Sequence, residues 1–186
     1  MEEWEAKLDV MHRYDLTAHI YDIRYAEEQI EKIETATKRI RMKNQDFILD
    51  VGCGTGLLFN YIPDRVETIV GIDISRKTLL QAKENTRRMK NLYLISADAD
   101  NIPLKNEIFS HIFAITLLQN MPNSKATLSE IKRVAKEKAF IIITGLKKKY
   151  SLNFFKNLLK KNGLNIIYMT SEGLKCHVAV CKENPP

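Results

Sequence analysis

The stretch from Phe47 to Gly56, FILDVGCGTG, joins an apolar run to one aspartate and three glycines. Gly52, Gly54 and Gly56 are spaced by two residues and follow closely after Asp50. Glycines permit a tight turn and let a ligand approach the main chain. In an open α/β sheet, a loop that follows a strand in this way lies at the edge where ligands bind. The stretch therefore predicts a binding site for a ligand that suits a neighbouring carboxylate.

Two ligand classes use such a loop, dinucleotides and S-adenosylmethionine. The dinucleotide motif has the spacing G-x-G-x-x-G/A, which brings a pyrophosphate to a helix N-terminus. Here the third glycine position of that motif is Leu57, and Asp50 would repel a pyrophosphate. A carboxylate suits instead a ligand with an ammonium group and a sulfonium. No Lys-Ser/Thr pair follows the glycines, which excludes a P-loop, and an NAD-binding oxidoreductase is a distant alternative.

Two further acids follow the next two strand-like runs. Asp73 ends the second run, where one carboxylate can accept both hydroxyl groups of a ribose. Asp98 follows the third run, where its carboxylate can accept a hydrogen bond from the exocyclic amine of adenine. Ile74 can cover one face of that base. Three acids at three successive strand ends, together with the glycines, indicate a positively charged cofactor that contains a nucleoside.

The elements that must position these residues alternate along the chain after residue 42. Strands are expected over 47–51, 68–72, 92–96, 110–116, 139–144, 164–170 and 174–181. Helices are expected to begin near Thr55, Ser75, Ser124 and Ser151, with Ser75 and Ser124 as N-caps. The early strands are continuously apolar, which is typical of strands covered by helices on both faces. Three residues join the last two runs, so these form a hairpin and one strand is antiparallel.

The composition is that of one globular domain. The chain has 186 residues, of which 45% are hydrophobic and 28% are charged. We expect a single domain over 1–186, with a helical lid over 1–42 and a catalytic α/β core over 43–183. No apolar run approaches the roughly 20 residues of a membrane span, and the acidic start does not resemble a signal peptide, so a soluble, cytoplasmic protein is expected. The three cysteines form no zinc-type cluster, and no metal is predicted.

At these motifs the sequence resembles the class I S-adenosylmethionine-dependent methyltransferases. LDVGCGTG, GIDIS and ADADNIPLKNEIFSHIFAI are similar to successive motifs of that family, and YDLTAHIYD resembles the YDxxAxxYD segment of small members with an N-terminal lid. The resemblance implies a Rossmann-like, doubly wound, seven-stranded sheet in the order 3-2-1-4-5-7-6 with the last strand antiparallel. It implies S-adenosyl-L-methionine as the cofactor and S-adenosyl-L-homocysteine as the product. The cofactor-binding residues expected on this basis are Tyr14, Tyr21, Asp50, Gly52, Cys53, Gly54, Gly56, Asp73, Ile74, Asp98, Ala99 and Thr116.

The acceptor is less defined by the sequence than the cofactor. Methyl transfer is a direct displacement at an activated methyl group, so the protein mainly has to hold the nucleophile in line. Asn120, after the fourth strand, and Tyr21, in the lid, are the residues expected to position the acceptor. The [D/N/S]-P-P-[Y/F] motif of some base-amine methyltransferases is not matched after the fourth strand, where residues 115–118 read ITLL.

Lysines are concentrated near the C-terminal end of the chain, where residues 121–186 hold thirteen Lys or Arg against four Asp or Glu. We expect a basic rim for RNA phosphates on the ligand side of the sheet, formed by Lys147, Lys148, Lys149, Lys156, Lys160 and Lys161. RNA, tRNA included, is therefore narrowly favoured as the acceptor. The alternatives are a small-molecule acceptor and a methyltransferase-like binding subunit that acts with a partner chain.

Overall fold

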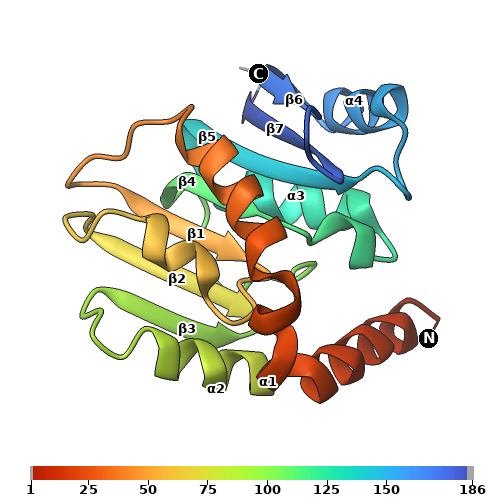
Figure 1. Cartoon of the computed structure of the whole chain (residues 1–186). Coiled ribbons are helices and arrows are strands. Elements are labelled where there is room, and N and C mark those ends of the chain that lie inside the picture. Colours follow the sequence, from red (N-terminus) through yellow and green to blue (C-terminus); the bar gives the residue numbers. More distant parts are fainter. Residues whose placement is uncertain (1, 184–186) are drawn as a thin grey trace.

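The computed structural model describes residues 2–183, apart from the side chain of Tyr21. Seven strands form one mixed sheet in the order β3-β2-β1-β4-β5-β7-β6 (Figure 1). Their bounds are β1 Phe47–Val51, β2 Thr68–Asp73, β3 Leu92–Ser96, β4 Phe109–Ala114, β5 Ala135–Leu146, β6 Leu164–Thr170 and β7 Cys176–Glu183. The strand β7 is antiparallel to both β5 and β6, and the other pairs are parallel. The predicted sheet order and its antiparallel last strand are confirmed.

Helices cover both faces of this sheet. The helical segments are α1 Glu2–Thr37, α2 Arg76–Asn85, α3 Ser124–Val134, α4 Leu152–Lys161 and the 3₁₀ turns η1 Leu57–Tyr61 and η2 Leu118–Asn120. One core cluster joins Leu49 of β1 to Leu128 of α3 and Phe155 of α4. The other joins Ile48 of β1 to Ile33 of α1 and Leu79 of α2. Because successive strand residues face opposite sides, Ile48 and Leu49 belong to different layers, and the fold is doubly wound.

The first helix crosses the end of the sheet. Figure 1 shows α1 changing direction near its middle and passing in front of the arrowheads of β1 and β2. The helix was expected to reach residue 42, but it ends at Thr37. Short-range bonds follow, from Arg39 N–H to Ala36 O and from Ile40 N–H to Thr37 O, and the turn they make lets Met42 enter the core. Within residues 2–183, none of the helices is both long and apolar enough to cross a membrane.

Several predicted bounds are corrected where tertiary contacts decide them. The helix expected near Thr55 is the short 3₁₀ turn η1, and the N-cap of α3 is Asn123 rather than Ser124, because the Asn123 side chain accepts the N–H of Ala126. Ser75 is confirmed as the N-cap of α2. The strand β4 ends at Ala114, two residues early, and β5 and β7 extend beyond their predicted ends.

Candidate functional site

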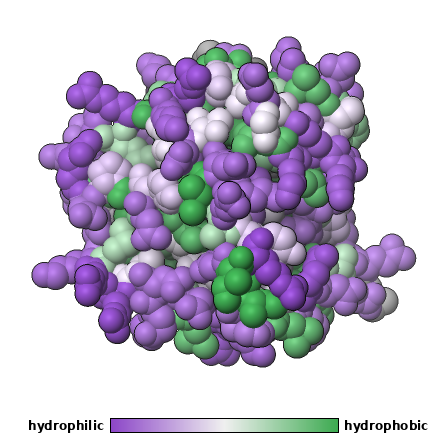
Figure 2. All heavy atoms as spheres, in the orientation of Figure 1, coloured by the Kyte–Doolittle hydropathy of each residue, from purple (hydrophilic) through white to green (hydrophobic). Residues whose placement is uncertain are grey.

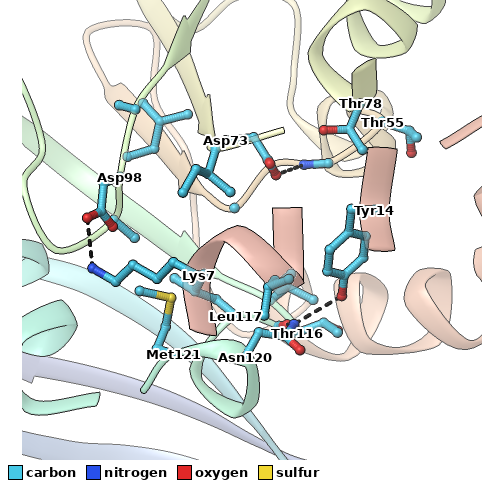
Figure 3. A pocket seen from close by; sticks show the side chains of 18 residues that line it. Lys7, Tyr14, Thr55, Asp73, Thr78, Asp98, Thr116, Leu117, Asn120 and Met121 are labelled. Carbon is cyan, nitrogen blue, oxygen red and sulfur yellow. Dashed lines mark hydrogen bonds and ion pairs between the residues drawn. The ribbon is translucent and has the colours of Figure 1, made fainter. Parts of the chain in front are cut away.

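A cleft lies beneath α1, where β1 to β4 end. The space between its walls, including the part that is open to solvent, is about 760 Å³. Its apolar lining is Val10, Ile72, Ile74, Ala97, Ala99, Ile115, Leu117 and Met121 (Figure 3). Its other lining residues are Lys7, Tyr14, Gly52, Gly54, Thr55, Asp73, Thr78, Asp98, Thr116 and Asn120.

The glycine loop forms the floor of this cleft. The N–H groups of Gly52 and Cys53 both donate to Ile72 O, at 2.8 and 2.9 Å, which holds the loop against β2. Gly54 has φ +53°, and no atom lies within 4 Å of where a Cβ would stand, so a ligand can reach its main chain. Gly56 does not line this cleft. A Cβ at Gly56 would stand 2.9 Å from the ring of Phe59, so this glycine serves the packing of η1.

Asp73 joins the glycine loop to the start of α2. One carboxylate oxygen accepts the N–H of Gly54 at 2.9 Å, and the other accepts the N–H of Ser75 at 2.8 Å. Burial raises the pKa of Asp73, although these two donors act in the opposite direction. The side chain also lines the cleft, and its structural role in fixing the loop was not anticipated.

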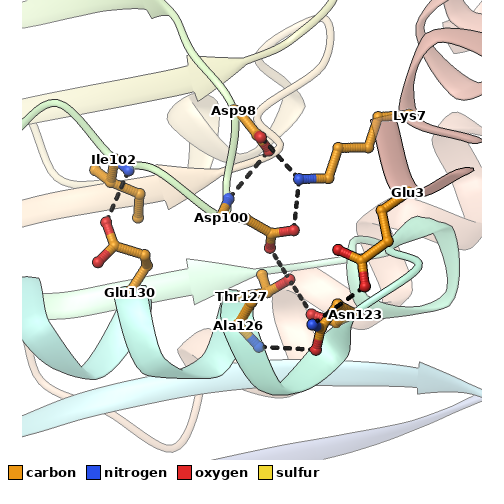
Figure 4. Close-up of polar contacts among 9 residues, drawn as sticks. All are labelled: Glu3, Lys7, Asp98, Asp100, Ile102, Asn123, Ala126, Thr127 and Glu130. Atoms are coloured by element: carbon orange, nitrogen blue, oxygen red, sulfur yellow. Dashed lines mark hydrogen bonds and ion pairs between the residues drawn. The ribbon is translucent and has the colours of Figure 1, made fainter. Parts of the chain in front are cut away.

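Asp98 faces the cleft but is paired with a lysine of the lid. The Lys7 ammonium lies 2.7 Å from Asp98 Oδ2 and 2.5 Å from Asp100 Oδ2 (Figure 4). Burial opposes the charge on Lys7, but bonds to the two carboxylates outweigh burial and raise its pKa. Lys7 was not among the predicted site residues, because no local pattern shows that the start of α1 reaches the end of β3.

Asp50 and Cys53 line a second, smaller cavity, which adjoins the cleft. Gly52, Gly54, Thr55 and Ile115 line both spaces. Burial raises the pKa of Asp50 to about 8, and the charge of Asp73 adds to this effect. Burial also raises the pKa of the Cys53 thiol, which is consistent with a reduced, unreactive cysteine.

Tyr14 and Asn120 form a polar pair on the wall of the cleft. The Asn120 amide donates to the Tyr14 hydroxyl at 3.0 Å and to Thr116 O at 2.9 Å. Thr116 has φ +61°, and its N–H donates to the Thr144 hydroxyl at 2.7 Å instead of continuing the strand. Burial raises the pKa of Tyr14, so its phenol is protonated near neutral pH. Tyr21 was predicted to lie beside Tyr14, but its side chain is outside the part of the chain that the structure describes.

Two aspartates fasten the middle of α1 over the site. Asp15 accepts the hydroxyl of Ser75 at 2.5 Å, and Asp22 accepts the hydroxyl of Thr55 at 2.6 Å. The lid is therefore attached to the loops that follow β1 and β2. The shape and the length of the lid could not be derived from the YDxxAxxYD pattern alone.

The six lysines of the predicted rim line neither of the two cavities. Lys147 donates to Ser171 O at 2.6 Å, and Lys149 donates to Gln119 O at 2.8 Å. Lys147, Lys148 and Lys149 are exposed just after β5, Lys160 and Lys161 are exposed on α4, and Lys156 is partly buried there. The triplet thus lies on the ligand side of the sheet, but outside the cleft.

Comparison with known proteins places these features in a family. A methyltransferase domain family matches residues 49–143. The chain is 31% identical over 157 residues to an uncharacterized protein of Methanocaldococcus jannaschii. That alignment covers 84% of this chain and 59% of the other protein. It is 31% identical over 108 residues to a demethylmenaquinone methyltransferase of Staphylococcus saprophyticus (56% of this chain, 46% of that protein). It is 25% identical over 142 residues to a malonyl-[acyl-carrier protein] O-methyltransferase of Marinomonas sp. (75% and 52%). The chain thus spans less than two thirds of the length of these curated relatives.

Solved structures show the same fold over nearly the whole chain. A SAM-dependent methyltransferase from Aquifex aeolicus superposes with a TM-score of 0.79 at 21% identity, covering 90% of this chain and 97% of that one. A putative methyltransferase in complex with the Haloferax volcanii Trm112 methyltransferase activator also superposes with a TM-score of 0.79, at 14% identity, covering 92% and 98%.

Proposed function

Because this chain belongs to the class I S-adenosylmethionine-dependent methyltransferases, we propose that it methylates a small, largely apolar acceptor that is held beneath α1. The observation that carries this proposal is the apolar wall at Leu117, which lies beside the hydrogen-bonded pair of Tyr14 and Asn120 (Figure 3). Apolar walls with a few convergent polar groups are typical of small-molecule sites. Asn120 supplies the polar group of this wall.

The cleft also fits the cofactor. Gly54 offers an open main chain, Asp73 faces the position expected for the ribose, and Asp98 faces that expected for the adenine amine. Asp50 in the adjoining cavity suits the methionyl ammonium, because 4% exposure leaves its carboxylate little water. We assign the predicted residues Ile74, Ala99 and Thr116 to the same site, since all three line the cleft.

The chemistry asks little of the protein beyond positioning. S-adenosylmethionine, when bound, would supply an activated methyl group to an acceptor held in line with it. Asn120 and Tyr14 would orient the acceptor, because each presents a polar group to an otherwise apolar wall. A protonated Tyr14 phenol is a hydrogen-bond donor and not a base. An acceptor that already carries a nucleophilic lone pair or a readily lost proton therefore fits this site best.

RNA stays a prediction that the geometry supports less well. The lid is attached over the cleft through Lys7, Asp15 and Asp22, so part of the cleft is covered. Two of the rim lysines already donate to main-chain oxygens. The names of two relatives, a demethylmenaquinone and a malonyl-[acyl-carrier protein] methyltransferase, also favour an acceptor other than RNA. The activator complex of the Haloferax neighbour supports, as an alternative, a requirement for a partner chain.

The test is transfer of a radiolabelled methyl group from S-adenosylmethionine into a cell extract of the source organism. Separate portions are treated with RNase, treated with protease, or extracted to recover small and lipophilic molecules. We expect label in the small-molecule portion, equally with the parent and with a variant in which Lys147, Lys148 and Lys149 are alanine.

Each other outcome points elsewhere. Label that RNase removes, and that the triple lysine variant fails to transfer, would replace the small acceptor with RNA. Label that protease removes would indicate a protein acceptor. An absence of label, with S-adenosylhomocysteine still bound, would indicate that a partner chain is required.

A further inference from the structure

The ammonium group of Lys7 lies in the cleft beside Asp98, and we propose that the two residues together read the adenine edge of the cofactor. Asp98 accepts a hydrogen bond from the amine, and Lys7 donates one to the adjacent ring nitrogen. The inference rests on the proposed placement of adenine at Asp98, and it adds Lys7 to that site as a second residue.

Lys7 has a donor to spare. A lysine ammonium carries three N–H donors, and the described residues provide partners for two of them, Asp98 and Asp100. The Lys7 side chain is only 9% exposed, so bulk water has little access to the third. Lys7 lines the cleft, and Figure 3 shows its side chain extending between Asp98 and Met121. An acceptor atom of a ligand in the cleft can therefore complete its hydrogen bonding.

The chemistry of the pair matches adenine. Each polar edge of adenine presents its amine, a donor, beside a ring nitrogen, an acceptor. An asparagine or glutamine amide reads such an edge because it places an acceptor next to a donor. Asp98 Oδ2 and Lys7 Nζ, 2.7 Å apart, present the same order of groups from two residues. A base with an oxygen in place of the amine would set that oxygen against the Asp98 carboxylate.

The surroundings hold the pair in place before any ligand binds. Thr127 donates to Asp100 Oδ1 at 2.5 Å, and the N–H of Asp100 donates to Asp98 Oδ1 at 3.1 Å (Figure 4). One turn earlier in α1, Glu3 accepts from the Asn123 side chain at 3.4 Å. Lys7 therefore needs neither to leave Asp98 nor to move the lid when it donates to adenine. A group fixed in this way loses little entropy on binding.

The opposite role for Lys7 predicts the opposite result. If the ammonium instead occupied the place of the adenine amine, then its removal would strengthen cofactor binding. The two roles are therefore separated by the sign of one measured change.

The experiment measures the affinities of S-adenosylhomocysteine and of its 1-deaza and 7-deaza analogues, each of which lacks one ring nitrogen beside the amine. The proteins are the parent, Lys7→Met, and Lys38→Met, which removes an exposed lysine of the same lid segment that is paired with Glu34. We expect Lys7→Met to weaken S-adenosylhomocysteine binding by about tenfold or more, and Lys38→Met to leave it unchanged. We expect one of the two deaza analogues to bind the parent about tenfold or more weakly than S-adenosylhomocysteine does. The same analogue and S-adenosylhomocysteine should bind Lys7→Met with equal affinity.

The ratio of two affinities within one variant does not depend on how much of that variant is folded, so the result stands even if Lys7→Met is less stable. Equal ratios in the parent and in Lys7→Met for both analogues would overturn the proposal, as would tighter binding by Lys7→Met. Failure of the parent and of Lys38→Met to bind S-adenosylhomocysteine would count instead against the cofactor site itself.

Discussion

The Tyr14 hydroxyl lies 3.0 Å from the side-chain nitrogen of Asn120, so two residues 106 positions apart share a hydrogen bond at the wall of the cleft. Tyr14 belongs to α1, and Asn120 ends the turn that follows β4. The same Asn120 amide donates to Thr116 O. This pair therefore links the position of the lid to the conformation of the strand end where the acceptor is expected.

Because the two side chains share one bond, their removal should be non-additive. We expect Tyr14→Phe and Asn120→Ala each to slow methyl transfer into the extract, while S-adenosylhomocysteine affinity falls by less than about tenfold, as for the loss of one neutral hydrogen bond. The double variant should transfer no more slowly than the slower single variant. Losses in rate that simply multiply would show that the two residues act independently.

Ser75 and Ser151 offer a matched comparison of two helix caps. Each side chain accepts one N–H at the start of its helix, from Thr78 at 3.2 Å and from Phe154 at 3.3 Å. We expect Ser151→Ala to lower the free energy of unfolding by about 1 kcal/mol, and Ser75→Ala to lower it by more, because the buried Ser75 hydroxyl also bonds to a carboxylate. Only Ser75 also donates to Asp15 of the lid, so only Ser75→Ala should weaken S-adenosylhomocysteine binding. Chemical denaturation and calorimetric titration of both variants check this, and equal binding losses would contradict a role of Ser75 in holding the lid.

The sequence was sufficient for the parts of the site that follow from strand ends. Asp73 and Asp98 could be placed because the carboxyl ends of parallel strands meet at one edge, and buried strands have a recognisable apolar pattern. The three glycines were predicted to act alike, but Gly54 faces open space whereas Gly56 packs against the ring of Phe59. Glycines of one motif can thus have different surroundings, which the spacing alone does not predict.

Contacts between distant segments set the limit of what could be predicted. The end of β4 depends on the Thr144 hydroxyl, which accepts a hydrogen bond from the N–H of Thr116. This bond holds Thr116 in a left-handed conformation. Lys7 reaches Asp98 across 91 positions of the sequence. No local periodicity encodes either contact, since each depends on how a helix or a strand docks against the rest of the sheet.

Asp50 should make the stability of the protein depend on pH. Its pKa is about 8 in the folded chain, mainly because of burial, and about 4 when it is unfolded. The folded state binds the proton more tightly, so the contribution of Asp50 to the free energy of unfolding is greatest below about pH 4 and is lost between about pH 4 and 8. We expect Asp50→Asn to gain stability relative to the parent between pH 5 and pH 8. Denaturation at both values checks this, and the exposed Asp64→Asn variant should show no such change.

The same carboxyl group should make cofactor binding depend on pH. An ammonium group favours the ionised form of Asp50, so binding near pH 7 should release a proton, and the affinity should rise with pH until about pH 8. S-adenosylhomocysteine carries that ammonium group, whereas 5′-methylthioadenosine keeps the ribose and the adenine and lacks it. We therefore expect S-adenosylhomocysteine affinity to rise more steeply than methylthioadenosine affinity between pH 6 and pH 8, and Asp50→Asn to remove the difference. Parallel pH profiles for the two ligands in the parent would place the ammonium group away from Asp50 and would leave its carboxyl group a purely structural part of the glycine loop.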